Sequence, residues 1–389
     1  MQSGATEVRP FELFFDLVFA FSLIQITNTI VYDDSVLGVA HGLVVLCIVW
    51  LAWVGFTSLA NVGLPSPNSR DWRPPVFVLA MGFMLLVAIS IPTAFWQDDK
   101  LFAYSIGALG LTWFVAYLVL TAGSPERRRD VYRMTGLALL LPAAVIVSSY
   151  LPVTWISVLL LGIGLVGAAL SPFAARPVQW PLGREHLVER YELFIIIALG
   201  ESLISIGLGA TGATRNGELV VGILIAVLLV AVMWRVYLVG VCETGRAHLQ
   251  GLDVRSAHLF ARVAYVYLHL LVAAGIILVA AGLKVAMADV TTDVTPLFGA
   301  LLVIGLSLFL VSILVFRYLA TGRWEWWRLI GIAALLGVGL AAGSTPDLVF
   351  LALTTAVAIL GSWPDVLPSS TSVPFMRTHR SRDEGDSRG

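Results

Sequence analysis

Long apolar stretches recur along the chain, and short polar segments separate them. Twelve stretches approach the roughly 20 mostly apolar residues that a helix needs to cross a membrane, and the last two are the shortest. They are residues 11–31, 37–57, 75–95, 101–122, 133–150, 152–170, 191–209, 217–241, 260–281, 294–319, 329–344 and 347–361. Turn-forming residues mark several boundaries, as at Pro152. The pattern predicts an all-α, polytopic bundle of about twelve transmembrane helices.

The composition of the 389 residues points to the same class. Hydrophobic residues make up 58% and charged residues 13%, and the mean hydropathy is +0.90. Soluble domains carry about 25% charged residues, and disordered chains are poor in hydrophobic residues, so both classes are excluded. The net charge of −1 offers no basic face to nucleic acid. The expected partner is therefore the lipid bilayer.

The basic residues predict the orientation of the chain in the membrane. With a cytoplasmic N-terminus and twelve crossings, nineteen of the 24 Lys and Arg residues fall in inner segments, whereas Lys100, Arg215 and Lys284 fall in outer ones. The positive-inside rule therefore predicts that both termini are cytoplasmic. We expect a multi-pass protein of the plasma membrane. The polar composition of residues 362–389 predicts a disordered cytoplasmic tail.

A short internal repeat suggests how the helices are grouped. Glu-Leu-Phe at 12–14 recurs at 192–194, and the helices that follow carry Trp53 and Trp234 at nearly the same offset. Six helices separate the two copies, so the copies have the same membrane polarity, as in one class of secondary transporters. We therefore divide the chain into two parallel six-helix repeats, 1–180 and 181–361. A match this short also arises by chance.

Ionisable residues within the apolar stretches are the candidate functional residues, because each costs roughly 2.5–3.5 kcal/mol or more in hydrocarbon. Glu12 and Asp16 share one helix face, where they either line a site or cap the positive end of the helix. Glu201 and Arg235 lie on consecutive antiparallel helices, and their similar depth predicts an ion pair. Such a pair can also serve only to hold helices together.

A polar stripe is predicted at the start of the ninth helix. Arg255, His258, Arg262, Tyr265 and His269 are spaced by 3, 4, 3 and 4 residues, which places them on one helix face. The stripe either lines a polar cavity or forms a solvated extension of the helix, and the second interpretation explains His269 poorly. The candidates for binding a substrate or a proton are Glu12, Asp16, Glu201, Arg235, Arg262, Tyr265 and His269.

No metal or cofactor is expected. Cys47 and Cys242 are predicted to lie at different depths, and His258 and His269 are not spaced by four residues as paired zinc ligands on a helix would be. The chain contains neither a Gly-x-Ser-x-Gly nucleophile motif nor a phosphate-binding loop that ends in Gly-Lys. We therefore assign no catalytic residue.

Several segments resemble the low temperature requirement protein A (LtrA) family of bacterial membrane proteins. They are residues 12–21 (ELFFDLVFAF), 186–202 (HLVERYELFIIIALGES), 265–284 (YVYLHLLVAAGIILVAAGLK), 92–95 (PTAF) and 102–104 (FAY), and the resemblance covers about residues 9–361. It implies an integral membrane protein needed for growth at low temperature. The polar positions that recur in the family map onto Glu12, Asp16, Glu189, Arg190, Glu201 and His269.

Three functions are compatible with these features. The first is a secondary transporter or permease for an unidentified small molecule, with proton coupling through Glu201 and His269. The second is a membrane-embedded enzyme that acts on a lipid or another apolar metabolite, with Glu201 or Asp16 as general acid or base. The third is a non-catalytic protein for low-temperature or stress adaptation. A homodimer is compatible with all three.

Overall fold

The computed structural model describes residues 9–33, 35–61, 73–94, 100–152, 154–174, 182–291 and 294–366. These residues form helices and no strand. The first half of the chain forms α1 (Pro10–Asp33), α2 (Val36–Asn61), α3 (Arg73–Ser90), η1 (Ile91–Thr93), α4 (Leu101–Leu120), α5 (Pro125–Ala138), α6 (Leu140–Ser148), α7 (Trp155–Leu170) and η2 (Ser171–Ala174).

The second half begins at α8 and contains two π-helical segments, η4 and η5. Its elements are α8 (Arg184–Ala210), α9 (Gly217–Tyr237), η4 (Leu238–Glu243), α10 (Thr244–Gly251), α11 (Val254–Phe260), η5 (Ala261–Leu268), α12 (His269–Ala286), α13 (Pro296–Thr321), α14 (Trp326–Gly339), α15 (Asp347–Leu360) and α16 (Trp363–Val366).

A helix occupies each of the twelve predicted apolar stretches. Within the described residues, ten helical spans are long and apolar enough to cross a membrane, and α14 and α15 are shorter apolar helices. Each of these two has 14 residues, about 21 Å of helix. The prediction of an all-α bundle with about twelve spans is confirmed.

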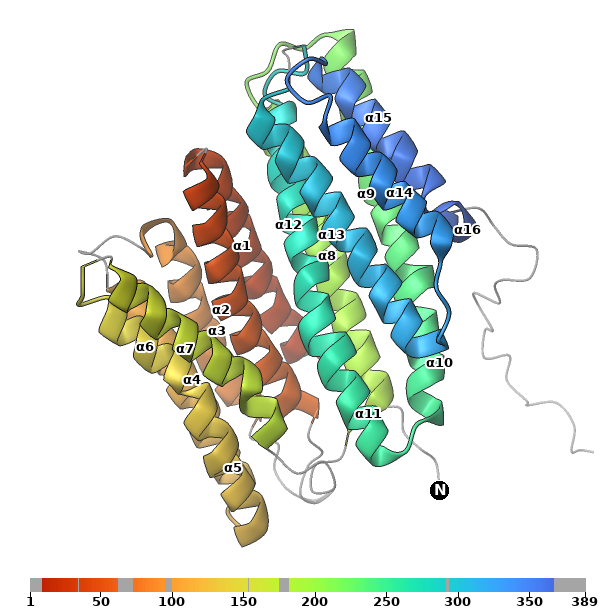
Figure 1. Ribbon diagram of the computed structural model, residues 1–389. Coiled ribbons are helices and arrows are strands. Elements are labelled where there is room, and N and C mark those ends of the chain that lie inside the picture. The colour runs from red at the N-terminus through yellow and green to blue at the C-terminus, as the bar shows by residue number, and fades with distance from the viewer. Residues whose placement is uncertain are drawn as a thin grey trace, which may run out of the picture.

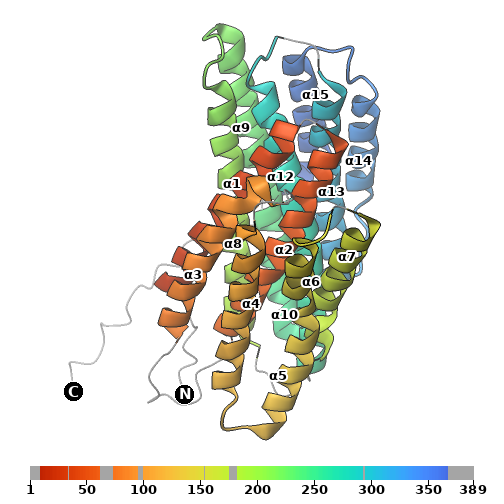
Figure 2. The ribbon, with the colours of Figure 1, turned by 90° about the vertical axis from the view of Figure 1, so that its left-hand side faces the viewer.

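The two halves of the chain meet along α1, α2, α8 and α12. Figure 1 shows α1 and α2 beside α8 and α12, with α4 to α7 on the outer side of the first half. Turned by 90°, the bundle shows α5 extending beyond the neighbouring helix ends (Figure 2). The span that ends in α12 is the most buried of the ten. Residues on α12 therefore lie at the centre of the molecule.

Close backbone contacts allow α12 to pack tightly against α13. A Cβ added at Gly275 would meet the carbonyl oxygen of Gly305, and one added at Gly305 would meet the carbonyl oxygen of Gly275. Small residues at such crossings let membrane helices approach closely, which increases van der Waals contact where water provides no driving force. The glycine pair is therefore a packing requirement of the core.

The parallel six-helix repeat stays a prediction, although the same pairs of helices touch in both halves. The contact of α1 with α3 matches that of α8 with α12, and the contact of α3 with α4 matches that of α12 with α13. Two observations differ from the prediction. Trp53 is buried whereas Trp234 is 43% exposed, and the contact register of α1 and α8, described below, differs from the offset of the sequence repeat.

Candidate functional site

A buried layer of charged residues joins the two halves near the start of α1 and α8. The guanidinium of Arg190 donates to both carboxylate oxygens of Asp16, at 2.7 and 2.8 Å. His186 Nε2 lies 2.8 Å from Glu12 Oε2, and Trp53 Nε1 donates to Asp16 Oδ1 at 2.8 Å. Bidentate pairing satisfies two opposite charges in one geometry. This layer has the character of a structural link.

The sequence placed Glu12 and Asp16 correctly on one face but did not identify their partners. Neither residue acts mainly as a helix cap, because both side chains are almost fully buried against α8. His186 and Arg190 repeat the spacing of four residues seen in Glu12 and Asp16. That shared spacing was the available signal for a paired layer, since residues four apart on parallel helices face each other at two successive levels.

The contacts define the register of α1 against α8. Glu12 contacts His186 and Asp16 contacts Arg190, so both pairs are separated by 174 positions in the chain. The two copies of the sequence repeat begin at Glu12 and Glu192, so their offset exceeds the contact register by about 9 Å of helix. The contact register places Thr27 of α1 level with Glu201 of α8.

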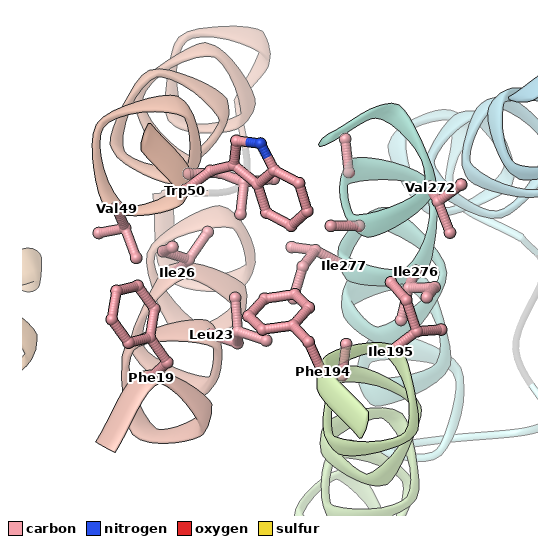
Figure 3. Packing of buried hydrophobic residues seen from close by; sticks show 14 of the residues in the cluster. Phe19, Leu23, Ile26, Val49, Trp50, Phe194, Ile195, Val272, Ile276 and Ile277 are labelled. Carbon is pink, nitrogen blue, oxygen red and sulfur yellow. The ribbon is translucent and has the colours of Figure 1, made fainter. Parts of the chain in front are cut away.

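An apolar layer lies between these two levels. Figure 3 shows Leu23 of α1 beside Phe194 of α8, with Phe19 of α1 near Val49 of α2 and with Ile277 of α12 on the other side. The ring centre of Phe194 lies 5.3 Å from that of Trp50 and 4.4 Å from that of Trp53. Each side chain named here is nearly inaccessible. The layer separates the charged residues near Asp16 from the polar residues near Glu201.

Glu201 is buried and only partly hydrogen-bonded. Its side chain is 2% exposed, and Ser205 Oγ donates to its Oε1 at 2.8 Å. Its other oxygen, Oε2, has no hydrogen-bond partner among the described residues, and neither do the buried hydroxyls of Thr27 and Ser202. Thr27 lies close enough to act on the Glu201 carboxylate, but without the geometry of a hydrogen bond. A buried polar atom without a partner costs free energy of folding, so the group is a candidate for binding a ligand or a proton.

The predicted ion pair between Glu201 and Arg235 is wrong. The cation that acts electrostatically on Glu201 is Lys284 of α12, which the sequence assigned to an outer loop. The contacts of Glu192 with Arg246 and of Arg184 with the Leu249 carbonyl place Glu201 and Arg235 at similar depths. Arg235 is only half-buried in the last turn of α9 and forms no ion pair with Glu201 among the described residues, so the two side chains face different neighbours.

Lys284 connects Glu201 to a polar cavity at the end of α1. Its Nζ donates to Asn28 Oδ1 at 2.5 Å and lies 5.1 Å from the centre of the Tyr32 ring. Asn28 and Tyr32 line a cavity of about 590 Å³. The remaining lining residues are Gln25, Thr29, Asp33, His41, Ile91 and Pro92. The cavity is rich in amide, hydroxyl and carboxylate groups, which suit a polar solute.

His269 belongs to a separate buried cluster. Its Nδ1 lies 2.8 Å from the carbonyl oxygen of Ala264, so Nδ1 carries the proton and Nε2 accepts from the Tyr237 hydroxyl at 3.1 Å. The Tyr265 ring stacks on the imidazole with ring centres 4.9 Å apart. Both hydrogen-bonding atoms of His269 are satisfied, which distinguishes it from Glu201.

The predicted polar stripe is divided by the π-helical segment η5. A π-helix shifts the hydrogen-bond pattern by one residue, so the spacing of an ideal α-helix no longer applies. Arg262 lies 5.2 Å from the centre of the Phe173 ring, on the side of the first half. Tyr265 and His269 instead pack among Tyr191, Tyr237 and Phe316. Trp50 Nε1 donates to the Val266 carbonyl at 2.8 Å and holds η5 against α2.

A second ion-paired network ties the C-terminal helices together. Arg317 contacts Glu325 at 2.5 Å, and Arg328 contacts Glu325 at 2.9 Å and Asp365 at 2.5 Å. Asp365 is buried in α16, although the sequence assigned residues 362–389 to a disordered tail. Residues 362–366 are therefore part of the folded bundle, and 367–389 lie outside the described residues. The polar composition of this segment concealed the pairing.

Within the described ranges, no three His, Cys, Asp or Glu side chains gather closely enough to hold a metal ion. The arrangement instead offers a partly satisfied carboxylate, a nearby ammonium group and unpartnered hydroxyls. These groups can exchange a proton or bind a small polar solute.

Fold and site together define a multi-pass, all-helical membrane protein with a polar site between its two halves. Residues 7–362 match the model of a family described as bacterial low temperature requirement A protein (LtrA), and the chain belongs to this family. An uncharacterized protein of Rhizobium meliloti (strain 1021) is 29% identical over 283 residues, which cover 70% of this chain and 67% of the relative. No solved structure matches the chain.

Proposed function

We propose that this protein is a secondary transporter or permease for a small polar solute, and that Glu201 and Lys284 belong to its binding site. The observation that carries the proposal is the buried Glu201 carboxylate, which has one unpartnered oxygen among the described residues and lies near a polar cavity. Buried ionisable groups in membrane helices commonly mark a substrate or ion pathway. A donor group of a solute, or a proton, would satisfy Oε2.

The contrast between the two ends of the α1–α8 contact supports alternating access. Towards the Asp33 end of α1, polar side chains lead from the cavity to Asn28 and Lys284. Towards the Glu12 end, the apolar layer and the ion-paired layer fill the contact. We infer that the structure represents a state open on one side, and that opening the other side requires the ion-paired layer to separate.

We further infer that the protein lies in the plasma membrane with cytoplasmic termini. The cavity beside Tyr32 and Asp33 would then face the outside of the cell. The ion-paired layer would lie towards the cytoplasm. The basis is the excess of Lys and Arg in the segments predicted to be inner.

Cysteine labelling tests the one-sided access. Cys47 and Cys242 would first be replaced by Ala, and single cysteines would be placed at Thr29, which lines the cavity, and at Ser22, which is fully buried on the same helix. A membrane-impermeant thiol reagent added outside whole cells should label Thr29→Cys and leave Ser22→Cys unmodified. Equal labelling of the two positions would contradict the proposed access.

Uptake into proteoliposomes tests transport itself. The protein would be reconstituted with an imposed pH gradient and offered a panel of labelled amino acids, sugars and organic acids. We expect uptake of at least one compound, and Glu201→Gln should reduce it at least tenfold. Asp289→Asn is the matched control, because Asp289 lies in the exposed segment after α12 and its carboxylate accepts from nearby Thr291. No uptake by the wild-type protein would overturn the proposal.

Growth at low temperature separates transport from a purely structural role. In a host that lacks its own LtrA protein, the transport proposal predicts that Glu201→Gln fails to restore growth in the cold at normal expression. Full restoration by this variant would favour a non-catalytic protein. Formation of a modified lipid, found by mass spectrometry only when Glu201 is intact, would favour an enzyme.

A further inference from the structure

A continuous face of α2 lines two apolar cavities in the first half of the molecule. The lining residues of this helix include Leu37, His41, Val44, Ile48, Leu51, Gly55 and Ser58. Their spacing alternates between four and three residues, which places them on one face of the α-helix. Ile48 lines both cavities. The face therefore forms one groove of about 32 Å, close to the thickness of the hydrocarbon core.

The opposite wall of the groove comes from α4, α6 and α7. One cavity has a volume of about 120 Å³ and the other about 440 Å³. An apolar cavity of about 150 Å³ already holds a molecule the size of benzene, so the larger cavity accepts a segment of an alkyl chain and the smaller one accepts a shorter piece. The groove lies within membrane-spanning segments, where the surrounding molecules are lipids. Of its lining residues, only His41 is shared with the polar cavity beside the Glu201 site.

One buried polar atom in this lining has no hydrogen-bond partner among the described residues. Trp113 of α4 lines the smaller cavity, and its indole nitrogen is buried without an acceptor among the described residues. The side chain is 8% exposed. A Cβ added at Gly55 would lie 3.1 Å from this nitrogen, so the glycine leaves space beside the N–H group. Buried indole N–H groups usually have a partner, which points to a ligand with an acceptor oxygen.

We propose that the groove binds one acyl chain of a bilayer phospholipid, whose ester carbonyl accepts a hydrogen bond from Trp113 Nε1. Gly55 lies six residues from the end of α2, about 9 Å. That depth is near the boundary of the hydrocarbon core, where the acyl chain joins the glycerol ester. From Gly55 to Val44 the groove extends about 16 Å, which matches one leaflet. This lipid site goes beyond the proposed transport and does not depend on it.

Lipid titrations followed by native mass spectrometry test the site. The probes are a diester phosphatidylglycerol and its dialkyl ether analogue, which lacks the carbonyl oxygens. The wild-type protein should bind the diester about fivefold more tightly than the diether, because one hydrogen bond is worth about 1 kcal/mol. Trp113→Phe should bind both lipids with the weaker affinity. Gly162→Trp, which fills the larger cavity, should weaken both.

Two substitutions serve as controls. Trp234→Phe removes an indole N–H from a partly exposed position on α9, and Gly82→Trp adds a ring on α3 where a Cβ would meet nothing within 4 Å. Both should retain the wild-type preference for the diester. Equal binding of diester and diether by the wild-type protein would overturn the role of Trp113. Unchanged binding by Gly162→Trp would overturn the groove itself.

Discussion

The contact between α1 and α8 contains two polar levels that differ in whether their carboxylates are ion-paired. At the lower level, near the start of both helices, Asp16 accepts from Arg190 and Trp53, and Glu12 contacts His186, although Arg190 Nε and His186 Nδ1 have no hydrogen-bond partner among the described residues. At the upper level, Glu201 Oε2 and the hydroxyl of Thr27 have no partner among the described residues. Both levels follow the same helix register. Helix packing alone therefore does not explain the unpaired groups.

The difference shows where this fold uses buried polar groups for stability and where it leaves them available to bind a solute or a proton. Buried ion pairs that are also hydrogen-bonded fix the relative position of helices, and breaking one leaves an uncompensated charge. A buried site that lacks partners lowers stability and is retained mainly where it has a function. The comparison therefore assigns the lower level to structure and the upper level to the proposed transport.

The largest expected effect is on the lower level. Arg190→Met removes the guanidinium and leaves Asp16 charged and buried, so the free energy of unfolding should fall by about 3–5 kcal/mol. Thermal unfolding of the purified protein in detergent measures the change. The double variant Asp16→Asn with Arg190→Met should lose less than the sum of the two single variants, because neither charge remains. Additive losses would contradict the pairing.

A smaller loss is expected from the two tryptophans of α2. Trp53→Phe removes a hydrogen bond to a charged carboxylate, which should cost about 1.5–3 kcal/mol. Trp50→Phe removes one to the neutral carbonyl of Val266, which should cost about 0.5–1.5 kcal/mol. Thermal unfolding of the two variants, purified in the same detergent, shows which one loses more stability. The reverse order would show that the charge on Asp16 contributes little at the lower level.

At the upper level we expect a gain in stability. Thr27→Val replaces an unpartnered buried hydroxyl with a methyl group of similar shape, which should raise the free energy of unfolding by about 1 kcal/mol. Uptake should decrease in the same variant. Thr354→Val is the control, since that hydroxyl donates to Phe350 at 2.9 Å and its removal should not stabilise the protein. A loss of stability in Thr27→Val would show that this hydroxyl binds Glu201 directly.

The smallest effect concerns a group outside both levels. Hydrogen bonds hold the pKa of Asp253 below its ordinary value of 3.8. The largest contribution comes from the Ser256 side chain, and backbone N–H groups add to it. A lowered pKa means that this carboxylate stabilises the fold above pH 3.8 and that the contribution is lost as the pH falls below that value. The difference in melting temperature between wild type and Asp253→Asn should therefore shrink as the pH falls below 3.8. A difference in melting temperature that stays constant as the pH falls would contradict the stabilising role of the Asp253 carboxylate.

The sequence predicted which residues would be buried and polar better than it predicted their partners. Glu12, Asp16, Glu201, Tyr265 and His269 all proved to be buried. A polar group inside an apolar stretch avoids lipid by facing other helices, and its own place in the sequence is enough to predict this. The pairing of Glu201 with Arg235 failed because a similar depth does not determine which way two side chains face, and the cation that acts on Glu201 is Lys284 of α12.

Lys284 shows a second limit of sequence analysis. Its position at the end of an apolar stretch indicated a loop, whereas α12 continues to Ala286 and carries the side chain to Asn28. A long side chain near a helix end can reach the interface or turn towards a partner. Only the neighbouring helices decide between these, and the one that Lys284 reaches is α1, which is far from α12 in the sequence.

The sequence by itself determined the class of protein, the positions of its apolar helices and the residues whose burial needs an explanation. Those properties follow from local periodicity and from the cost of polar groups in lipid. The tertiary structure decided that Arg190 pairs with Asp16, that Lys284 acts on Glu201 and that η5 divides the polar stripe. These depend on the register and facing of helices distant in the chain, which periodicity within one helix does not encode.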